Sequence, residues 1–84
     1  MTITLLTRVG CSACATALAD LRRICAELGT DFDVVDVDQA AENGNRDLRA
    51  DYGDRLPVVL LNDVEHSYWE VDEPRLRTDL AARG

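Results

Sequence analysis

The sequence predicts an α/β fold in the element order βαβαββα, a layered sheet with helices on both faces. Short apolar runs rich in Val, Ile and Leu, which are typical of strands, alternate with segments whose apolar residues recur every three or four positions, as on one face of a helix. A turn of four residues separates the last two strand-like runs and forces them to pair as antiparallel neighbours. The 84-residue chain contains no repeat, linker or low-complexity tract, so we expect residues 1–84 to form one domain.

The first half of the chain is predicted to form a strand, a helix and a second strand. Residues 2–8 are rich in Thr, Ile and Leu and precede Gly10, which predicts a buried strand. A helix is expected from Ser12 until Gly29. Its apolar stripe consists of Cys14, Leu18, Leu21, Cys25 and Leu28. The apolar residues of the second strand are Phe32, Val34, Val35 and Val37. This order favours a right-handed crossover and parallel pairing of the two strands.

The middle of the chain is predicted to contain a loop, a short helix and a strand. Residues 39–45 are polar and are expected to form a loop, and residues 47–52 a helix of about two turns. Residues 56–61 form an apolar strand with Pro57 at its entrance, where a strand tolerates proline.

The end of the chain is predicted to contain a tight turn, a strand and a helix. In the turn, residues 62–65, Asn62 or Asp63 is expected to adopt the left-handed conformation because Val64 cannot easily do so. Residues 66–71 are the expected fourth strand, in which Tyr68 and Trp69 face opposite sides and Trp69 fills the core. The last helix is expected to have Asp72 or Glu73 as its cap, Pro74 in its first turn and an apolar stripe of Leu76, Leu80 and Ala81.

Charge and hydropathy exclude several classes of partner. The chain has 16 acidic residues, nine arginines and no lysine, which gives a net charge of -7 and repels a phosphate backbone. No apolar run approaches the roughly 20 residues that span a bilayer, and the residues before the first strand do not resemble a signal peptide. We therefore expect a cytoplasmic protein that binds neither nucleic acid nor membrane.

Cys11 and Cys14, spaced as CxxC at the junction between the first strand and its helix, are the candidate site. Such a pair can bind a metal, form a structural bridge or act as a redox dithiol. In the cytoplasm a structural disulfide is disfavoured, and the odd total of three cysteines argues against a disulfide framework. A structural zinc needs four ligands, and Cys25 lies about 16 Å further along the same helix, where we expect a core residue. His66 is expected to be solvated or to cap a turn.

The same pair has the geometry that dithiol chemistry requires. Residues three apart on a helix lie about 5 to 6 Å apart at Cβ, within reach of a disulfide. Cys11 at the helix N-terminus is favoured as a thiolate, because free N–H groups and the helix dipole stabilise the negative charge. Cys14 lies one turn deeper on the apolar stripe and is the expected resolving thiol. The acidic residues of the second strand region, Asp31, Asp33, Asp36 and Asp38, are expected to form its polar margin.

Several of these features together resemble the glutaredoxins, and in particular the short bacterial glutaredoxin-like proteins. The residues that carry the resemblance are Arg8, the stretch Gly10-Cys11-Ser12-Ala13-Cys14, Tyr52-Gly53, Leu56-Pro57 and the closing hairpin and helix. The resemblance implies a thioredoxin-like fold with a four-stranded mixed sheet in the order 2-1-3-4, in which strand three is antiparallel to strand one. It further implies a cis Pro57 beside the dithiol, a peptide group at Leu56 that binds the thiol substrate, and a cation at Arg8 that supports the Cys11 thiolate.

The resemblance implies a thiol-disulfide oxidoreductase, active in electron transport and redox homeostasis, that reduces protein or mixed disulfides with Cys11 as nucleophile and Cys14 as resolving thiol. Arg55 is a further candidate for contact with the carboxylate of an anionic thiol. No tightly bound cofactor or metal is expected. Electrons would come from a reductase or from glutathione or another low-molecular-weight thiol, and the protein is expected to be a monomer. The alternative is a non-enzymatic thioredoxin-fold binding module or a metal or iron-sulfur carrier that uses the CxxC.

Overall fold

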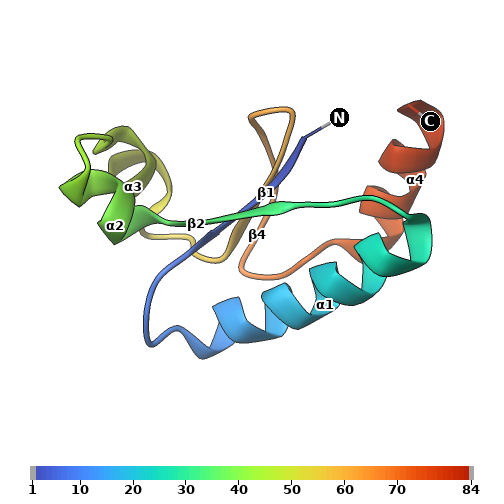
Figure 1. The fold of residues 1–84 in the computed structure, drawn as a ribbon, viewed down its shortest axis with the longest axis horizontal. Helices are drawn as coiled ribbons and strands as arrows, with labels where there is room; N and C mark the ends of the chain where they lie inside the picture. Colours follow the sequence, from blue (N-terminus) through green and yellow to red (C-terminus); the bar gives the residue numbers. More distant parts are fainter. Residues whose placement is uncertain (1, 84) are drawn as a thin grey trace.

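A computed structural model describes residues 2–83 and contains one mixed sheet with helices on both faces (Figure 1). Its elements in chain order are β1 (Ile3–Thr7), α1 (Ser12–Leu28), β2 (Asp33–Asp36), α2 (Val37–Glu42), α3 (Asp47–Tyr52), β3 (Val58–Leu61), β4 (Val64–Tyr68) and α4 (Glu73–Arg83). The strand order is β2-β1-β3-β4, with β1 parallel to β2 and antiparallel to β3, and β3 antiparallel to β4. The predicted α/β class and the sheet order 2-1-3-4 are therefore confirmed.

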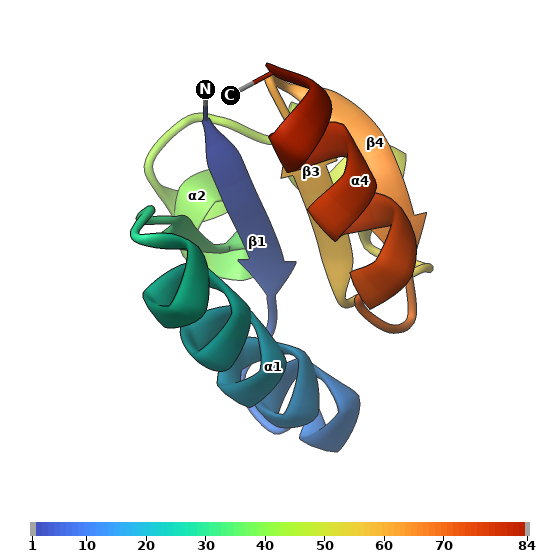
Figure 2. The same ribbon diagram turned by 90° about the vertical axis from the view of Figure 1, so that its right-hand side faces the viewer.

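Alternation along the strands divides the core into two layers. Ile3 and Leu5 of β1 pack with α1 and α4, in a cluster whose other buried members are Ala17, Leu21, Ile24, Cys25, Val59, Leu61 and Leu76. Leu6 points to the opposite face and packs with Val37, Val58 and Leu60, against Leu48 and Tyr52 of α3. Figure 2 shows α1 and α4 on the near side of the strands and α2 behind them. Successive side chains of a strand point to opposite faces, which is why β1 serves both layers.

Helix α1 begins at the dithiol and ends at a glycine. Cys11 is its N-cap residue, and Gly29 closes the C-terminus with a left-handed φ of 67° and N–H contacts to the last turn. The expected stripe is wrong at Leu28, which is 44% exposed. The helix is about 25 Å long whereas a five-residue strand covers about 17 Å, so its last turn extends beyond the sheet. Ala17 and Ile24 contribute to the buried face instead.

Helix α2 contains residues 39–42 of the expected loop 39–45, of which only residues 43–45 form a loop, and it takes Val37 out of the second strand. Asp36 ends β2 and accepts hydrogen bonds from the N–H groups of Asp38 and Gln39, which caps the helix at once. Val37 and Ala41, four residues apart, form its buried face. The strand prediction followed the Val-rich run, but Asp36 within that run acts as a helix start.

The turn between β3 and β4 begins where expected but has two residues instead of four, so β4 begins earlier than predicted. Asn62 and Asp63 both have positive φ, 53° and 66°, so both residues of the turn take the left-handed region and Val64 already belongs to β4. The ladder shifts register between Val59 and Leu60, which leaves His66 as the extra residue of a bulge. The predicted strand 66–71 is therefore wrong at both ends.

Helix α4 has the expected cap and only part of the expected stripe. The side chain of Asp72 accepts a hydrogen bond from the N–H of Arg75 at 3.3 Å, as an N-cap residue does. Leu76 is fully buried and Leu80 is half-buried, but Ala81 is exposed, in contrast to the prediction. The helix thus packs through a narrow contact near its first turns.

Ion pairs on the surface tie α4 to α1. Glu73 accepts from Arg23 of α1 at 2.8 Å and from Arg77 of α4 at 3.0 Å, and Arg77 also contacts Glu27 of α1. These hydrogen bonds, chiefly that from Arg23, lower the pKa of Glu73 from 4.5 to about 2. The ionised form of Glu73 therefore favours the folded chain.

Acid is expected to weaken this link between the helices. Because the folded pKa of Glu73 is depressed, its contribution to stability is present above the ordinary value of 4.5 and is lost as the pH falls toward about 2. The melting temperature of Glu73→Gln should fall less over that pH window than that of the unaltered chain. The matched control is Glu42→Gln, an exposed carboxylate of α2 outside this network. Parallel losses for all three proteins would show that Glu73 does not contribute.

The two ends of the described chain lie on the side of the molecule opposite the start of α1. Figures 1 and 2 both place the beginning of β1 and the last turn of α4 near one another, away from the loop that leads into α1. Among residues 2–83, no helix is long and apolar enough to cross a membrane.

Candidate active site

Cys11 and Cys14 are joined by a disulfide, with their Cα atoms 5.2 Å apart. The turn that presents them follows β1: Gly10 has a φ of 81°, and the N–H of Cys11 donates to the carbonyl oxygen of Arg8. A left-handed φ of this size favours glycine, because other residues would crowd their Cβ atom. The backbone N–H of Cys14 donates to Sγ of Cys11 at 3.1 Å. The helix N-terminus therefore directs a donor at the leading sulfur, as a thiolate needs.

The two cysteines differ in depth. Cys11 is partly exposed, whereas Cys14 is only 4% exposed and belongs to the buried face of α1. An incoming disulfide can approach Cys11, and Cys14 is shielded behind it. This difference fits an attacking thiol followed by a resolving one.

The loop before β3 brings Leu56 and Pro57 to the same edge of the sheet. Val58, the first residue of β3, pairs with Leu6 near the end of β1, so the preceding residues lie where the Cys11 loop leaves the sheet. The Leu56–Pro57 peptide is cis. The carbonyl oxygen of Pro57 accepts a hydrogen bond from the N–H of Trp69 at 2.7 Å. The structure thus shows the cis proline that the resemblance implied.

Two hollows lie beside the first turns of α1, and the two cysteines line only the first of them. The β2-side hollow has a volume of about 260 Å³ and is lined by Thr7, Arg8, Val9, Cys11, Cys14, Ala15, Leu18, Val34 and Asp36. The Trp69-side hollow has a volume of about 190 Å³ and is lined by Ala13, Thr16, Ala17, Asp20, Trp69 and Glu70. A partner segment that crosses the dithiol therefore has room in both hollows.

Arg8 borders the dithiol with its charge already paired. Its Nε lies 2.8 Å from Oδ2 of Asp38 and its Nη2 lies 3.1 Å from Oδ1, and Arg49 lies 3.6 Å from the same carboxylate. The hydrogen bond from Arg8 lowers the pKa of Asp38, and the same bond raises the pKa of Arg8. Asp36 and Asp38, expected as a strand margin, instead cap α2 and bind Arg8.

Arg55 is also held by side chains of the chain itself. Its Nη2 lies 3.1 Å from Glu65, its Nη1 lies 3.1 Å from Asp54, and its guanidinium carbon lies 5.5 Å from the centre of the Tyr52 ring. Glu65, chiefly through its hydrogen bond, raises the pKa of Arg55. Both arginines named as substrate contacts thus have carboxylates against them, and of the two only Arg8 lines the hollow that the cysteines also line.

Trp69 and Tyr68 are at the surface, so the prediction of a core role for Trp69 is wrong. Trp69 is 62% exposed and Tyr68 48% exposed, and their rings meet edge to face with centroids 5.0 Å apart. Trp69 has a φ of 69° and follows the end of β4. The chain turns there, and strand alternation no longer decides which way the indole points. Sequence reasoning therefore did not place Trp69 on the hollow beside α1 that it lines with Ala13.

The other candidates lie away from the dithiol. Cys25 is buried in the core as predicted, and burial raises the pKa of its thiol. His66 is 7% exposed, contrary to the expectation of a solvated residue; its Nε2 lies 2.7 Å from Oδ2 of Asp79, and its carbonyl oxygen accepts from Arg75. The bulge turns His66 toward α4. Within residues 2–83, no three His, Cys, Asp or Glu side chains are grouped to hold a metal ion.

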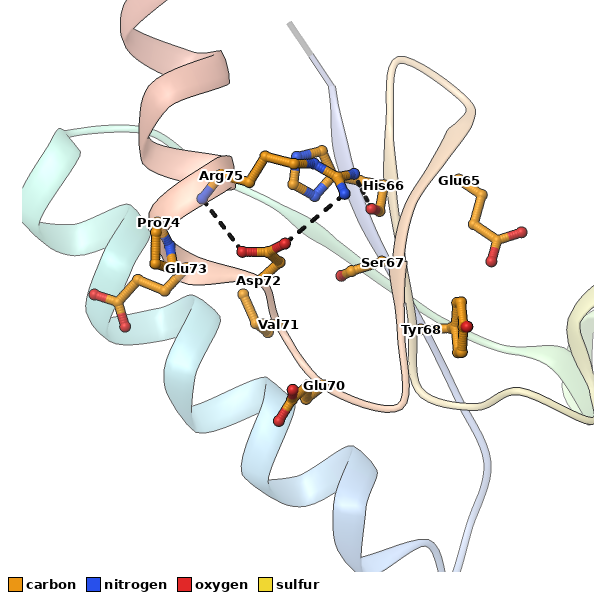
Figure 3. Close-up of a pocket in the computed structure, with 10 residues that line it drawn as sticks. All are labelled: Glu65, His66, Ser67, Tyr68, Glu70, Val71, Asp72, Glu73, Pro74 and Arg75. Carbon is orange, nitrogen blue, oxygen red and sulfur yellow. Dashed lines mark hydrogen bonds and ion pairs between the residues drawn. The ribbon is translucent and has the colours of Figure 1, made fainter.

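A larger hollow, of about 760 Å³, lies between β4 and the start of α4 (Figure 3). Polar side chains line much of it, and Asp72 lies beside the backbone and the guanidinium of Arg75. No cysteine lines this hollow. Size therefore does not identify the reactive site; the β2-side hollow, which Cys11 and Cys14 line, does.

Comparison with known proteins gives consistent results. A family model described as Glutaredoxin-like domain (DUF836) matches residues 2–81. The chain is 57% identical over 79 residues to the uncharacterized protein Rv0508 of Mycobacterium tuberculosis (strain ATCC 25618 / H37Rv), a match that covers 94% of this chain and 81% of the relative.

Two solved structures are similar along almost the whole chain. The X-ray structure of the structural genomics target XcR50 from X. campestris has a TM-score of 0.69 and 31% identity, covering 96% of this chain and 97% of the other. NrdH-redoxin from Escherichia coli, described as a glutaredoxin-like protein with a thioredoxin-like activity profile, has a TM-score of 0.61 and 34% identity over 90% of this chain and 95% of its own.

Proposed function

The chain belongs to the glutaredoxin-like domain family, and from this premise we propose that it is a thiol-disulfide oxidoreductase that reduces protein or mixed disulfides. The family and the likeness to NrdH-redoxin support thiol-disulfide redox function in general. The observation that carries the proposal is the position of the cysteine pair, with the exposed sulfur at the helix N-terminus accepting the N–H of the buried one.

The proposed reaction has two exchanges. The thiolate of reduced Cys11 attacks one sulfur of a substrate disulfide, a Cys11–substrate disulfide forms, and the other substrate sulfur leaves as a thiolate that takes up a proton. The thiol of Cys14 then loses its proton and attacks Sγ of Cys11, which forms the Cys11–Cys14 disulfide and releases the second substrate thiol. Two electrons pass to the substrate in each cycle, and an external thiol or a reductase must return them.

We further propose that Leu56 and Pro57 form one wall of the substrate groove, with the peptide of Leu56 as a partner for the bound thiol. Arg8 and Arg55 are proposed at the edge of this groove, each held by carboxylates of the chain. The reductant is a reductase or a low-molecular-weight thiol such as glutathione, no organic cofactor is tightly bound, and the protein works as a monomer in the cytoplasm. The thioredoxin-like activity profile of NrdH-redoxin supports a reductase.

A coupled assay tests this function. NADPH oxidation is followed in parallel reactions that contain glutathione with its reductase, thioredoxin reductase, or another small thiol with a matched reductase, each with 2-hydroxyethyl disulfide as substrate. We expect turnover that depends on the protein in at least one system. No turnover in any of them, together with metal that stays on the protein through gel filtration, would replace the proposal with the carrier function.

A further inference from the structure

The cations beside the dithiol are neutralised within the chain, while nearby carboxylates are not. Arg8 is held by both oxygens of Asp38. Among the described residues, Asp36 and Glu70 form no ion pair, and Asp20 has only a 3.7 Å contact to Arg23, whose guanidinium is bound by Glu73. An anionic ligand finds no free guanidinium here. A cationic ligand finds several carboxylates.

The Trp69-side hollow has the composition of a site for a basic side chain. One wall is the exposed indole of Trp69, and Asp20 and Glu70 supply negative charge. Guanidinium and ammonium groups are attracted to the face of an indole as well as to carboxylates. Figure 3 draws Glu70 beside α1, the helix that carries Asp20.

The backbone of Trp69 is held by the loop that precedes β3. The N–H of Trp69 donates to the carbonyl oxygens of Pro57, at 2.7 Å, and of Arg55, at 3.3 Å. Its φ of 69° lies in the left-handed region, which is uncommon for a bulky residue. A non-glycine residue kept in such a conformation while its side chain stays exposed is typical of a functional position.

The hollow has a length that peptides can match. It is lined from Ala13, next to the dithiol, to Asp20 on the same helix, seven residues or about 10 Å along the axis. An extended peptide covers about 3.4 Å per residue, so about three residues span the hollow from its end near the dithiol to its acidic end.

On this basis, and resting on the proposed function, we propose that the site selects disulfides in polypeptides with a basic side chain about three residues from the reacting cysteine. That side chain lies on the indole of Trp69 and pairs with Asp20 and Glu70. Peptides with an acidic side chain at that position are poor substrates, because the guanidinium of Arg8 is already held by Asp38. The attacked bond and the electron balance are those of the proposed exchange.

Single-turnover kinetics with matched peptides test the proposal. The pre-reduced protein is mixed with Cys-Gly-Gly-X peptides that carry 5-thio-2-nitrobenzoate on the cysteine, where X is arginine, glutamine or glutamate. Release of the coloured thiolate gives the rate, and each rate is divided by that of dithiothreitol with the same peptide. We expect arginine to exceed glutamate about fivefold at low salt, the value for two exposed ion pairs, and the ratio to shrink in about 1 M salt.

Variants locate the preference. In the double variant Asp20→Asn, Glu70→Gln the ratio should fall below about twofold, and Trp69→Leu should lower the arginine rate more than the glutamate rate. Asp31→Asn, which removes the same charge beyond the far end of α1, should keep the full ratio. A peptide with arginine directly after the cysteine, tested on the unaltered protein, should lose most of the advantage.

The possible results distinguish a failure of the proposed selectivity from a failure of the proposed oxidoreductase function. Equal rates for the three peptides, or a ratio that survives the double variant, overturns the selectivity while the redox function stands. If no peptide reacts with the protein although dithiothreitol reduces all of them, the proposed function itself fails.

Discussion

Replacing Cys11 by serine is expected to lower disulfide reduction to the background rate of the assay. A serine hydroxyl at the helix N-terminus does not ionise near neutral pH, so the attacking anion is lost. Replacing Cys14 by serine should leave the first exchange intact and block the second. The Cys14→Ser protein is therefore expected to accumulate a covalent Cys11–substrate disulfide, which mass spectrometry detects as an adduct that a reductant removes.

The chain offers a matched control for these variants in Cys25. Its thiol is buried in the core, and burial raises its pKa. Cys25→Ala should keep the redox activity and form no adduct. In the reduced, folded protein, iodoacetamide should modify Cys11 well before the other two thiols. Adduct formation through Cys14, or equal alkylation of Cys11 and Cys14, would contradict the assignment of nucleophile and resolving thiol.

The largest effect on folding is expected for Leu21→Ala. Leu21 is fully buried where α1 packs on the sheet, in the cluster that also contains Leu76 of α4. Removing a buried leucine side chain costs about 2 to 5 kcal/mol, through lost burial and the cavity left behind. Domains of this size are stable by about 5 to 15 kcal/mol at most, so the variant should lose a large fraction of its stability.

Leu28→Ala on the same helix is the control for helix propensity and side-chain loss. Leu28 is 44% exposed, so truncating it removes little buried surface. Urea unfolding followed by circular dichroism gives both free energies of unfolding. Equal losses for the two variants would mean that the face of α1 assigned to the core is wrong.

The sequence was sufficient for the elements that repeat a simple period. Apolar runs located β1 and β3, the helical stripe located α1, the segment before Gly53 was recognised as the short helix α3, and the short turn required an antiparallel hairpin. The sheet order came from the resemblance to glutaredoxins, because periodicity does not state which strands are neighbours. The geometry of the cysteine pair could be predicted for a similar reason, because the spacing of two residues on a helix determines how far apart their side chains lie.

Tertiary contacts decided the elements that sequence reasoning missed. Val37 continues a β-type run, yet Asp36 caps a helix there and Val37 is buried beneath it. The bulge in β4 leaves His66 as an extra residue, so its side cannot be counted from the alternation, and Trp69 lies beyond the strand in a left-handed conformation. Arg8 and Asp38 form an ion pair although they lie 30 residues apart in the chain, and no local sequence pattern predicts such a contact.

The common location of the two chain ends bears on how the protein can be attached to other molecules. The start of β1 and the last turn of α4 lie together on the side away from the dithiol. A fluorescent protein, a purification tag or a surface linker joined at either end would therefore stand behind the molecule and leave the front open to large partners. The same geometry would let an electrode-immobilised layer of this protein present its sulfurs to the solution.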